Sequence, residues 1–173
     1  MDLHRFVLVG ALGALIAASD LLLPSAEARA PAEQSDSVPR PVCPECDEVV
    51  VRVLRLLPKQ PESLVVVDLD RSGRALREKY QHVEGFVTTG GHTVYLTKQS
   101  AIMQKALAGP GIWDYALAIT VWHEMAHIDG ADEREAQLRE EELWKEFMRQ
   151  QRVDANRGLN YLKLLQKRHE DNH

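Results

Sequence analysis

A long apolar segment in the second half of the chain constrains the fold most. Residues 113–129 read WDYALAITVWHEMAHID, and Gly130 follows them as a typical helix stop. At about 100° per residue, apolar side chains cover nearly the whole circumference of the helix that this segment predicts. A helix that is apolar almost all round must be buried. We therefore expect residues 113–129 to form the central helix of a single globular domain.

This buried helix carries three ionisable side chains that need a reason to be there. On a helical wheel His127 lies at about 40° and Glu124 at about 100° from His123. Such groups are costly in an interior unless they are paired. Histidines at positions i and i+4 can both reach one metal ion, so the pattern predicts a metal site. The alternative is an ordinary helix whose histidines have other hydrogen-bond partners.

The run His123-Glu124-Met125-Ala126-His127 has the H-E-x-x-H arrangement and resembles the zincin metallopeptidases. The resemblance covers the motif helix and its flanks, about residues 86–137. It implies that His123 and His127 bind Zn²⁺ and that Glu124 is the general base that acts on water. It also implies that the reaction is hydrolysis of peptide bonds in a peptide or protein substrate.

The third metal ligand has to come from the segment that follows, GADEREAQ. A catalytic zinc site needs three protein ligands, and Gly130 lets the chain turn back towards the histidines. Glu133 occupies the place of a histidine in the metzincins, and it also fits the glutamate-bearing helix of the gluzincins. The resemblance therefore favours Glu133, and the other candidates are Glu135, Asp132 and Asp129. Gluzincins often carry an aspartate one turn after this ligand to brace a histidine, whereas Gln137 stands there in this chain.

Two further features of zincins are less clearly placed in this sequence. The strand GHTVYLT, residues 91–97, is either a strand that pairs with substrate or part of a plain hairpin. A donor to the transition state, often a tyrosine or histidine, has three candidates, which are Tyr161, His92 and Tyr95. For each of these three, an ordinary place in the core or on the surface is the favoured interpretation.

The other elements indicate an α+β fold. Residues 47–57 fit a strand or a helix, 63–70 a buried strand, and 71–85 a turn with a short helix. Residues 86–97 predict a hairpin with a two-residue turn at Gly90-Gly91. Helices are expected at 98–108, 132–151 and 154–167. The predicted domain, residues 43–173, thus has a small mixed sheet with a hairpin, a buried motif helix and C-terminal helices. The resemblance implies that this fold is zincin-like.

The first residues have the layout of a secretory signal peptide. His4 and Arg5 precede an apolar run, and small residues follow at AEARA. We expect cleavage after Ala28, with cleavage after Ala30 less favoured because Pro31 would follow the cut. Residues 29–42, rich in Pro, Ser and Ala, predict a disordered linker. The protein is then secreted or periplasmic, and it would be membrane-attached only if the signal segment stayed uncleaved.

Cys43 and Cys46 are the only cysteines. In an exported protein we expect them to form a structural disulfide, and we prefer this to a redox site because a proline-rich segment precedes them. Two rivals to the peptidase remain, namely a non-catalytic zinc-stabilised binding protein and a thiol–disulfide protein that uses this pair. The formal net charge of −5 gives no reason to expect a nucleic-acid partner.

Overall fold

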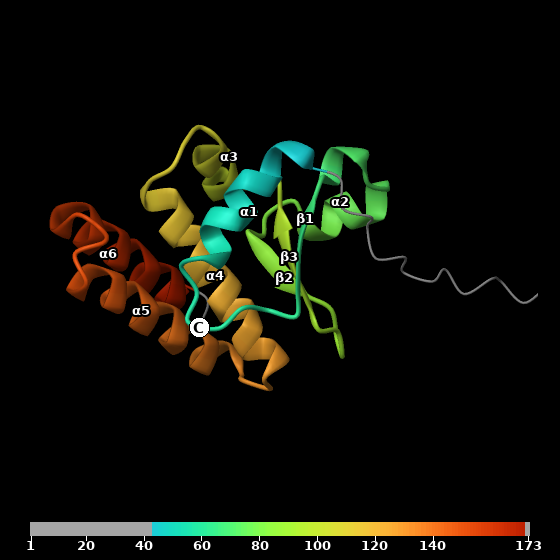
Figure 1. The fold of residues 1–173 in the computed structure, drawn as a ribbon. Helices are drawn as coiled ribbons and strands as arrows, with labels where there is room; N and C mark the ends of the chain where they lie inside the picture. The colour runs from blue at the N-terminus through green and yellow to red at the C-terminus, as the bar shows by residue number, and fades with distance from the viewer. Residues whose placement is uncertain (1–42, 172–173) are drawn as a thin grey trace, which may run out of the picture. The chain divides into compact units, whose positions relative to one another are not determined.

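The computed structural model of the chain describes residues 43–171 (Figure 1). This part combines six α-helices with one three-stranded mixed sheet, which confirms the α+β class. The predicted signal peptide, 1–28, and linker, 29–42, lie outside the described residues. Within 43–171, no helix has both the length and the apolar character needed to cross a membrane.

The sheet is built from β1 (Ser63–Val67), β2 (Gly85–Val87) and β3 (Thr93–Thr97) in the order β1-β3-β2. The central strand β3 runs parallel to β1 and antiparallel to β2. Val94 and Leu96 on β3 face the main core, while Tyr95 stacks on Phe86 in a second apolar cluster. Because β3 is buried on both faces, its three middle residues, 94–96, are apolar without a break.

The hairpin prediction is right about the strands and wrong about the turn. Strands β2 and β3 do pair antiparallel, but residues 88–92 join them rather than two glycines alone. The N–H of Gly91 donates to the carbonyl of Thr88 at 2.8 Å, so the tight turn begins before the glycine pair. Gly90 has a φ of 71°, a left-handed conformation that favours glycine.

The segment that fitted a strand or a helix is helical. A short 3-10 helix, η1 (Pro44–Cys46), leads into α1 (Asp47–Leu54). Val49 and Val53, one turn apart, are buried on one side of α1. This four-residue spacing favours a helix over a strand. The remaining helices are η2 (Leu69–Arg71), α2 (Arg74–Tyr80), α3 (Ala101–Leu107), α4 (Ile112–Ile128), α5 (Glu133–Arg149) and α6 (Ala155–Asp171).

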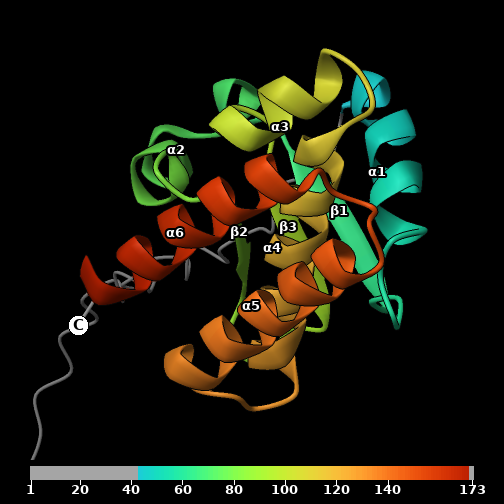
Figure 2. The same ribbon diagram turned by 90° about the vertical axis from the view of Figure 1, so that its left-hand side faces the viewer.

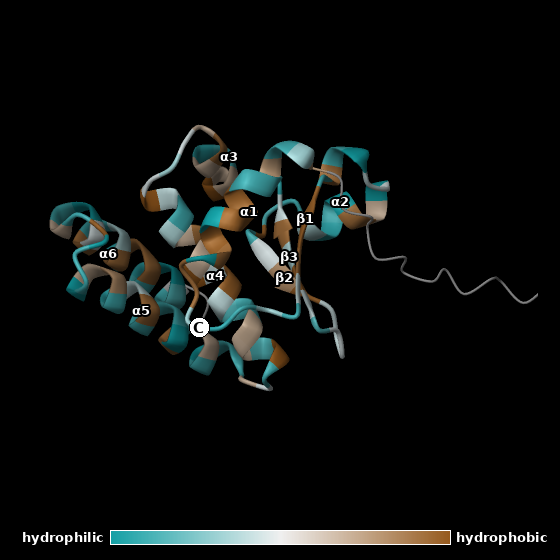
Figure 3. Ribbon diagram, viewed as in Figure 1, coloured by the Kyte–Doolittle hydropathy of each residue, from teal (hydrophilic) through white to brown (hydrophobic). Residues whose placement is uncertain are grey.

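Helix α4 is the central element, as its composition predicts. Leu117, Ile119 and Val121 have no exposed surface, and α4 contacts α1, α3, α5 and two strands of the sheet. Figure 1 shows it between the sheet on one side and the α5–α6 pair on the other. Figure 3 shows largely hydrophobic colouring on α4 and mixed colouring along α5 and α6, which therefore cover the core with one face each.

Helices α5 and α6 are joined by a buried hydrogen bond. Nε1 of Trp144 donates to the carbonyl of Gly158 at 2.9 Å. The predicted last helix is longer than expected, since α6 continues past Lys167 to Asp171. These extra residues bring Arg168 and His169 to the side of α4 where the motif lies.

The cysteine pair forms the predicted structural disulfide. Cys43 and Cys46 are bonded, with their Cα atoms 5.2 Å apart, at the beginning of α1. Both belong to the main core, and Cys46 is only 1% exposed. A catalytic disulfide has to be reached by its substrate, so this burial does not favour the thiol–disulfide rival.

Candidate metal centre

A tight turn after α4 brings the chain back to the motif. Gly130 adopts a φ of 92°, and the next N–H, that of Ala131, donates to the carbonyl of Ala126 at 2.9 Å. Asp132 then caps α5 by accepting from the N–H of Glu135 at 2.8 Å. Glu133 is thereby the first residue of α5.

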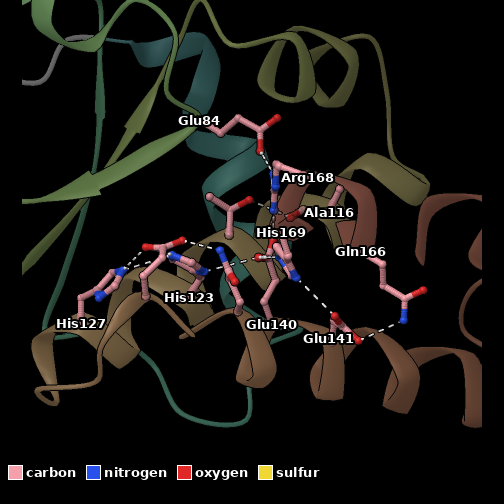
Figure 4. A network of polar contacts seen from close by, with 12 residues as sticks. Glu84, Ala116, His123, His127, Glu140, Glu141, Gln166, Arg168 and His169 are labelled. Carbon is pink, nitrogen blue, oxygen red and sulfur yellow. Dashed lines mark hydrogen bonds and ion pairs between the residues drawn. The ribbon is translucent and has the colours of Figure 1, made fainter. Parts of the chain in front are cut away.

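Three side-chain atoms converge at the end of α4 (Figure 4). The Nε2 atoms of His123 and His127 are 3.1 Å apart. Oε2 of Glu133 lies 3.6 Å from the first and 3.3 Å from the second. We call His123, His127 and Glu133 the ligand cluster. Ligand atoms at 2.0–2.1 Å from a tetrahedral zinc ion are about 3.3 Å from each other, so the cluster has suitable spacing.

The outer nitrogens of the two rings are already engaged. Nδ1 of His127 is 3.1 Å from the carbonyl of Ala131, which can only accept, so this nitrogen carries the ring proton. Nδ1 of His123 lies 3.3 Å from Oε2 of Glu140, at ion-pair distance although not aligned for a hydrogen bond. When both rings are neutral and protonated on Nδ1, the two Nε2 atoms and the carboxylate of Glu133 offer three lone pairs to one point, so the residues fit a metal ion.

Glu140 organises a buried set of charges behind His123. It is 1% exposed, its Oε1 accepts from Nη2 of Arg168 at 2.7 Å, and its Oε2 lies 3.4 Å from Nε2 of His169. Burial acts to raise the pKa of Glu140, but His123, His169 and Arg168 outweigh it and lower the pKa to about 2. Arg168 also donates to Glu84 at 3.1 Å, so α6 connects the start of β2 to the centre (Figure 4).

Sequence reasoning missed Glu140, although a signal was present. Leu143, Trp144 and Phe147 mark the apolar side of α5, and Glu140 lies on that same side, three, four and seven residues before them. A glutamate in an apolar stripe has to be paired, as this one is. Gln137, which stands where a bracing aspartate was sought, instead donates from Nε2 to Oε1 of Glu133 at 2.9 Å.

Glu124 lies beside the ligand cluster without joining it. The side chain is 9% exposed, and no hydrogen bond or ion pair links its carboxylate to another residue of 43–171. Burial raises the pKa of Glu124, and the opposing effect of His123 and His127 does not cancel this. A carboxylate with a raised pKa and no fixed partner suits a group that accepts and returns a proton.

A cavity of about 260 Å³ gives access to these groups. His123, Glu124 and Glu133 contribute to its wall together with Arg168 and His169. Strand β2 forms another part, and Gly85 is essential there because an added Cβ would lie 3.1 Å from Thr120 and 3.3 Å from Glu124. The glycine therefore lets the backbone of β2 approach α4 closely.

The other candidate ligands are engaged elsewhere. Asp132 caps α5, and Glu135 pairs with Arg139 at 2.6 Å. Asp129 lies 3.5 Å from the same arginine. Among the acids considered from the sequence, the structure brings Glu133 alone to the two histidines.

The structure decides two features that the resemblance left open, against a substrate-pairing role for residues 91–97 and in favour of ordinary places for the three suggested donors. Residues 91–97 contain the central strand β3, which is paired on both sides and cannot add a substrate strand. The sheet edge near the motif is β2 instead. None of the suggested donors lines the cavity, since Tyr95 and Tyr161 are core residues and His92 is exposed near Glu62.

Comparison with protein-family models, with curated proteins and with solved structures gave no match for this chain.

Proposed function

We propose that the chain is an exported zinc-dependent peptidase with a zincin-like, gluzincin-type centre. His123, His127 and Glu133 hold the metal, and Glu124 is the general base. The observation that carries the proposal is the ligand cluster, whose three potential ligand atoms lie within 3.6 Å of one another. The unpartnered carboxylate of Glu124 in the same cavity favours a catalytic over a purely structural metal.

The residues at the cavity have separate roles in hydrolysis. A bound zinc ion supplies Lewis acidity, which polarises a peptide carbonyl and makes water more acidic at neutral pH. Glu124 takes a proton from the attacking water as its oxygen bonds to the carbonyl carbon. The same carboxylic acid then gives that proton to the leaving amine as the C–N bond breaks. Glu140 and the carbonyl of Ala131 hold the two imidazole rings in place through Nδ1.

Strand β2 replaces β3 as the proposed partner of an extended substrate. It pairs only with β3, and Val83 to Gly85 line the cavity beside Glu124. Backbone pairing with such an edge would lay a substrate across the site, where Arg168 and His169 line the wall and the suggested tyrosines do not.

The test compares native protein with Glu124→Gln, both purified without chelator. We expect about one zinc per chain in each, measured by atomic emission, and cleavage of a protein-derived peptide mixture by the native chain only. Loss of a general base should lower the rate by at least about a hundredfold. Glu78→Gln, an exposed glutamate that pairs with Arg74, is the control and should change neither.

Two results would count against the peptidase. Absence of zinc in native protein, even after zinc is added back, would contradict the metal site itself. Zinc at full occupancy with no cleavage would favour the zinc-stabilised binding protein instead, and equal cleavage by Glu124→Gln would contradict the role of Glu124 as general base.

A further inference from the structure

A second depression, of about 580 Å³, lies at the opposite end of α4 from the ligand cluster. In both Figure 1 and Figure 2 the first turns of α4 lie between α1 and the beginning of α6. Residues 112 and 123 of α4 are about 16 Å apart along the helix at 1.5 Å per residue. The depression, here called the basic groove, is thus separate from the proposed active site.

Arginine side chains dominate the polar wall of the basic groove. Four contribute to it, namely Arg52, Arg55, Arg152 and Arg157. Arg52 is used within the fold, because it pairs with Asp114 at 3.1 Å and donates to the carbonyl of Ala106 at 2.8 Å. The other three, which we call the groove arginines, make no side-chain hydrogen bond or ion pair with any residue of 43–171.

The two carboxylates in the basic groove have other hydrogen-bond partners, and together they offset only two of its four arginine charges. Asp114 already accepts from Arg52 and from the N–H of Gly111, where α4 begins. Asp154 accepts from the backbone N–H of Arg157 at 3.0 Å, where α6 begins. Both acids therefore cap helices, and neither makes an ion pair with the groove arginines.

Three arginines elsewhere on the helices are paired, although Arg134 on α5 is not paired with any residue of 43–171. Arg74 pairs with Glu78, Arg139 with Glu135, and Arg149 with Glu146 within a turn of the same helix. The chain as a whole has 26 acids against 21 bases. Four arginines against two aspartates leave the basic groove with a net charge of +2 in an acidic chain, and this charge attracts an anion.

The rest of the wall indicates what kind of anion fits. Leu56, Ile112, Tyr115 and Val153 supply apolar and aromatic surface between the arginines. A concave site with apolar walls and a few convergent charges is typical of sites for small organic molecules. A guanidinium group binds a phosphate or carboxylate group through two parallel N–H···O hydrogen bonds.

We infer that the basic groove binds an organic anion, with phosphate or carboxylate groups held by Arg55, Arg152 and Arg157 and an apolar body held against Tyr115 and Ile112.

The experiment titrates three probes into the full chain at constant ionic strength and follows heat by calorimetry. Phenyl phosphate and benzoate each combine a ring with one type of anionic group, and inorganic phosphate lacks the ring. We expect saturable binding of at least one aromatic probe, tighter than that of inorganic phosphate. A stronger response to phenyl phosphate identifies a phosphate site, and a stronger response to benzoate identifies a carboxylate site.

Matched variants locate the binding. The triple change Arg55→Gln, Arg152→Gln, Arg157→Gln should weaken the probe at least tenfold. The triple change Lys59→Gln, Lys163→Gln, Lys167→Gln alters the net charge equally at exposed lysines outside the basic groove and should have no effect. The single change Arg152→Gln, at an exposed residue, should weaken the probe in part and provides the same comparison if the triple variant is poorly folded.

The inference is independent of the metal. Glu133→Ala should leave probe binding unchanged, whereas loss of binding in that variant would place the anion at the metal centre and overturn the proposal. No saturable binding of any probe, or equal weakening in the groove and control variants, would also overturn it.

Discussion

Helix α4 has opposite electrostatic surroundings at its two ends. At the C-terminal end, the ligand cluster gathers acceptor atoms, and the neighbouring Glu140 is buried and fully paired. At the beginning of α4, the groove arginines gather donors, and the acids nearby are engaged in capping. The first set is supported by a rigid buried network, whereas the second lies on exposed side chains.

The difference shows how unpartnered groups indicate a ligand. Acceptors that converge within 3.6 Å are a cost to the fold unless a cation joins them. Exposed donors cost less, because water solvates them, so an anion at the basic groove has to compete with water. We therefore expect tight binding at the ligand cluster and weaker, salt-dependent binding at the basic groove.

The largest effect should follow from changing the buried network. Glu140→Gln removes the charge that faces Arg168 and the two histidines, so we expect a loss of about 3–5 kcal/mol in the free energy of unfolding. Zinc affinity should also fall ten- to a hundredfold, because His123 loses its support. Urea unfolding and a zinc competition assay measure these two quantities.

Glu142→Gln is the control for that change, since Glu142 is exposed on the same helix. It should cost less than about 0.5 kcal/mol. An equal, small cost in both variants would show that Glu140 does not support the centre.

A smaller effect is expected from the third ligand. Glu133→Ala should weaken zinc binding by about a hundredfold or more, which is about 2.7 kcal/mol, while Glu135→Ala should leave it unchanged. The two glutamates are equally exposed at the start of α5, but Glu135 pairs with Arg139 instead of facing the histidines. A competition assay with a chelating dye measures the zinc affinity of both variants. A larger loss for Glu135→Ala would contradict the assignment made from the ligand cluster.

The local part of the centre was predictable from the sequence. The buried helix, its histidines one turn apart and the stop at Gly130 follow from periodicity and from one glycine. Glu133 could be favoured over its neighbours only through the resemblance, because its direction depends on the capping of α5 by Asp132. That capping is a local pattern too, and it explains why Asp132 itself is not a ligand.

The non-local part was not predictable in the same way. Strand order decides which strand is the free edge, and β1 enters the sheet beside β3 although β2 follows it in the chain. The resemblance therefore suggested β3 as an edge strand that could pair with substrate, whereas β3 is the middle strand of the sheet. The contacts of Glu140 with α6 join residues that are 28 or 29 apart, which no helical periodicity relates.

Close packing at the metal end provides a further test. Gly85→Ala should cost about 1–3 kcal/mol, because the new methyl group would lie 3.1–3.3 Å from Thr120, Glu124 and the carbonyl of Tyr95. Gly73→Ala is the control, since nothing lies within 4 Å of a Cβ at that position. Thermal unfolding compares them. Similar melting temperatures for the two variants would mean that β2 does not approach α4 as closely as described.

The smallest effect distinguishes the paired arginine of the basic groove from an unpaired one. Arg52→Met removes the partner of the buried Asp114 and should cost about 1–2 kcal/mol, because that carboxylate keeps only the N–H of Gly111. Arg55→Met, one turn away, breaks no pair and should change stability by less than about 0.5 kcal/mol. Urea unfolding at low and high salt measures both.

If Arg55→Met were stabilising at low salt and neutral at high salt, the repulsion among the groove arginines would be measured directly, since salt screens exposed charges. If instead Arg55→Met were as destabilising as Arg52→Met, Arg55 would have a structural partner and the contrast between the two ends of α4 would fail.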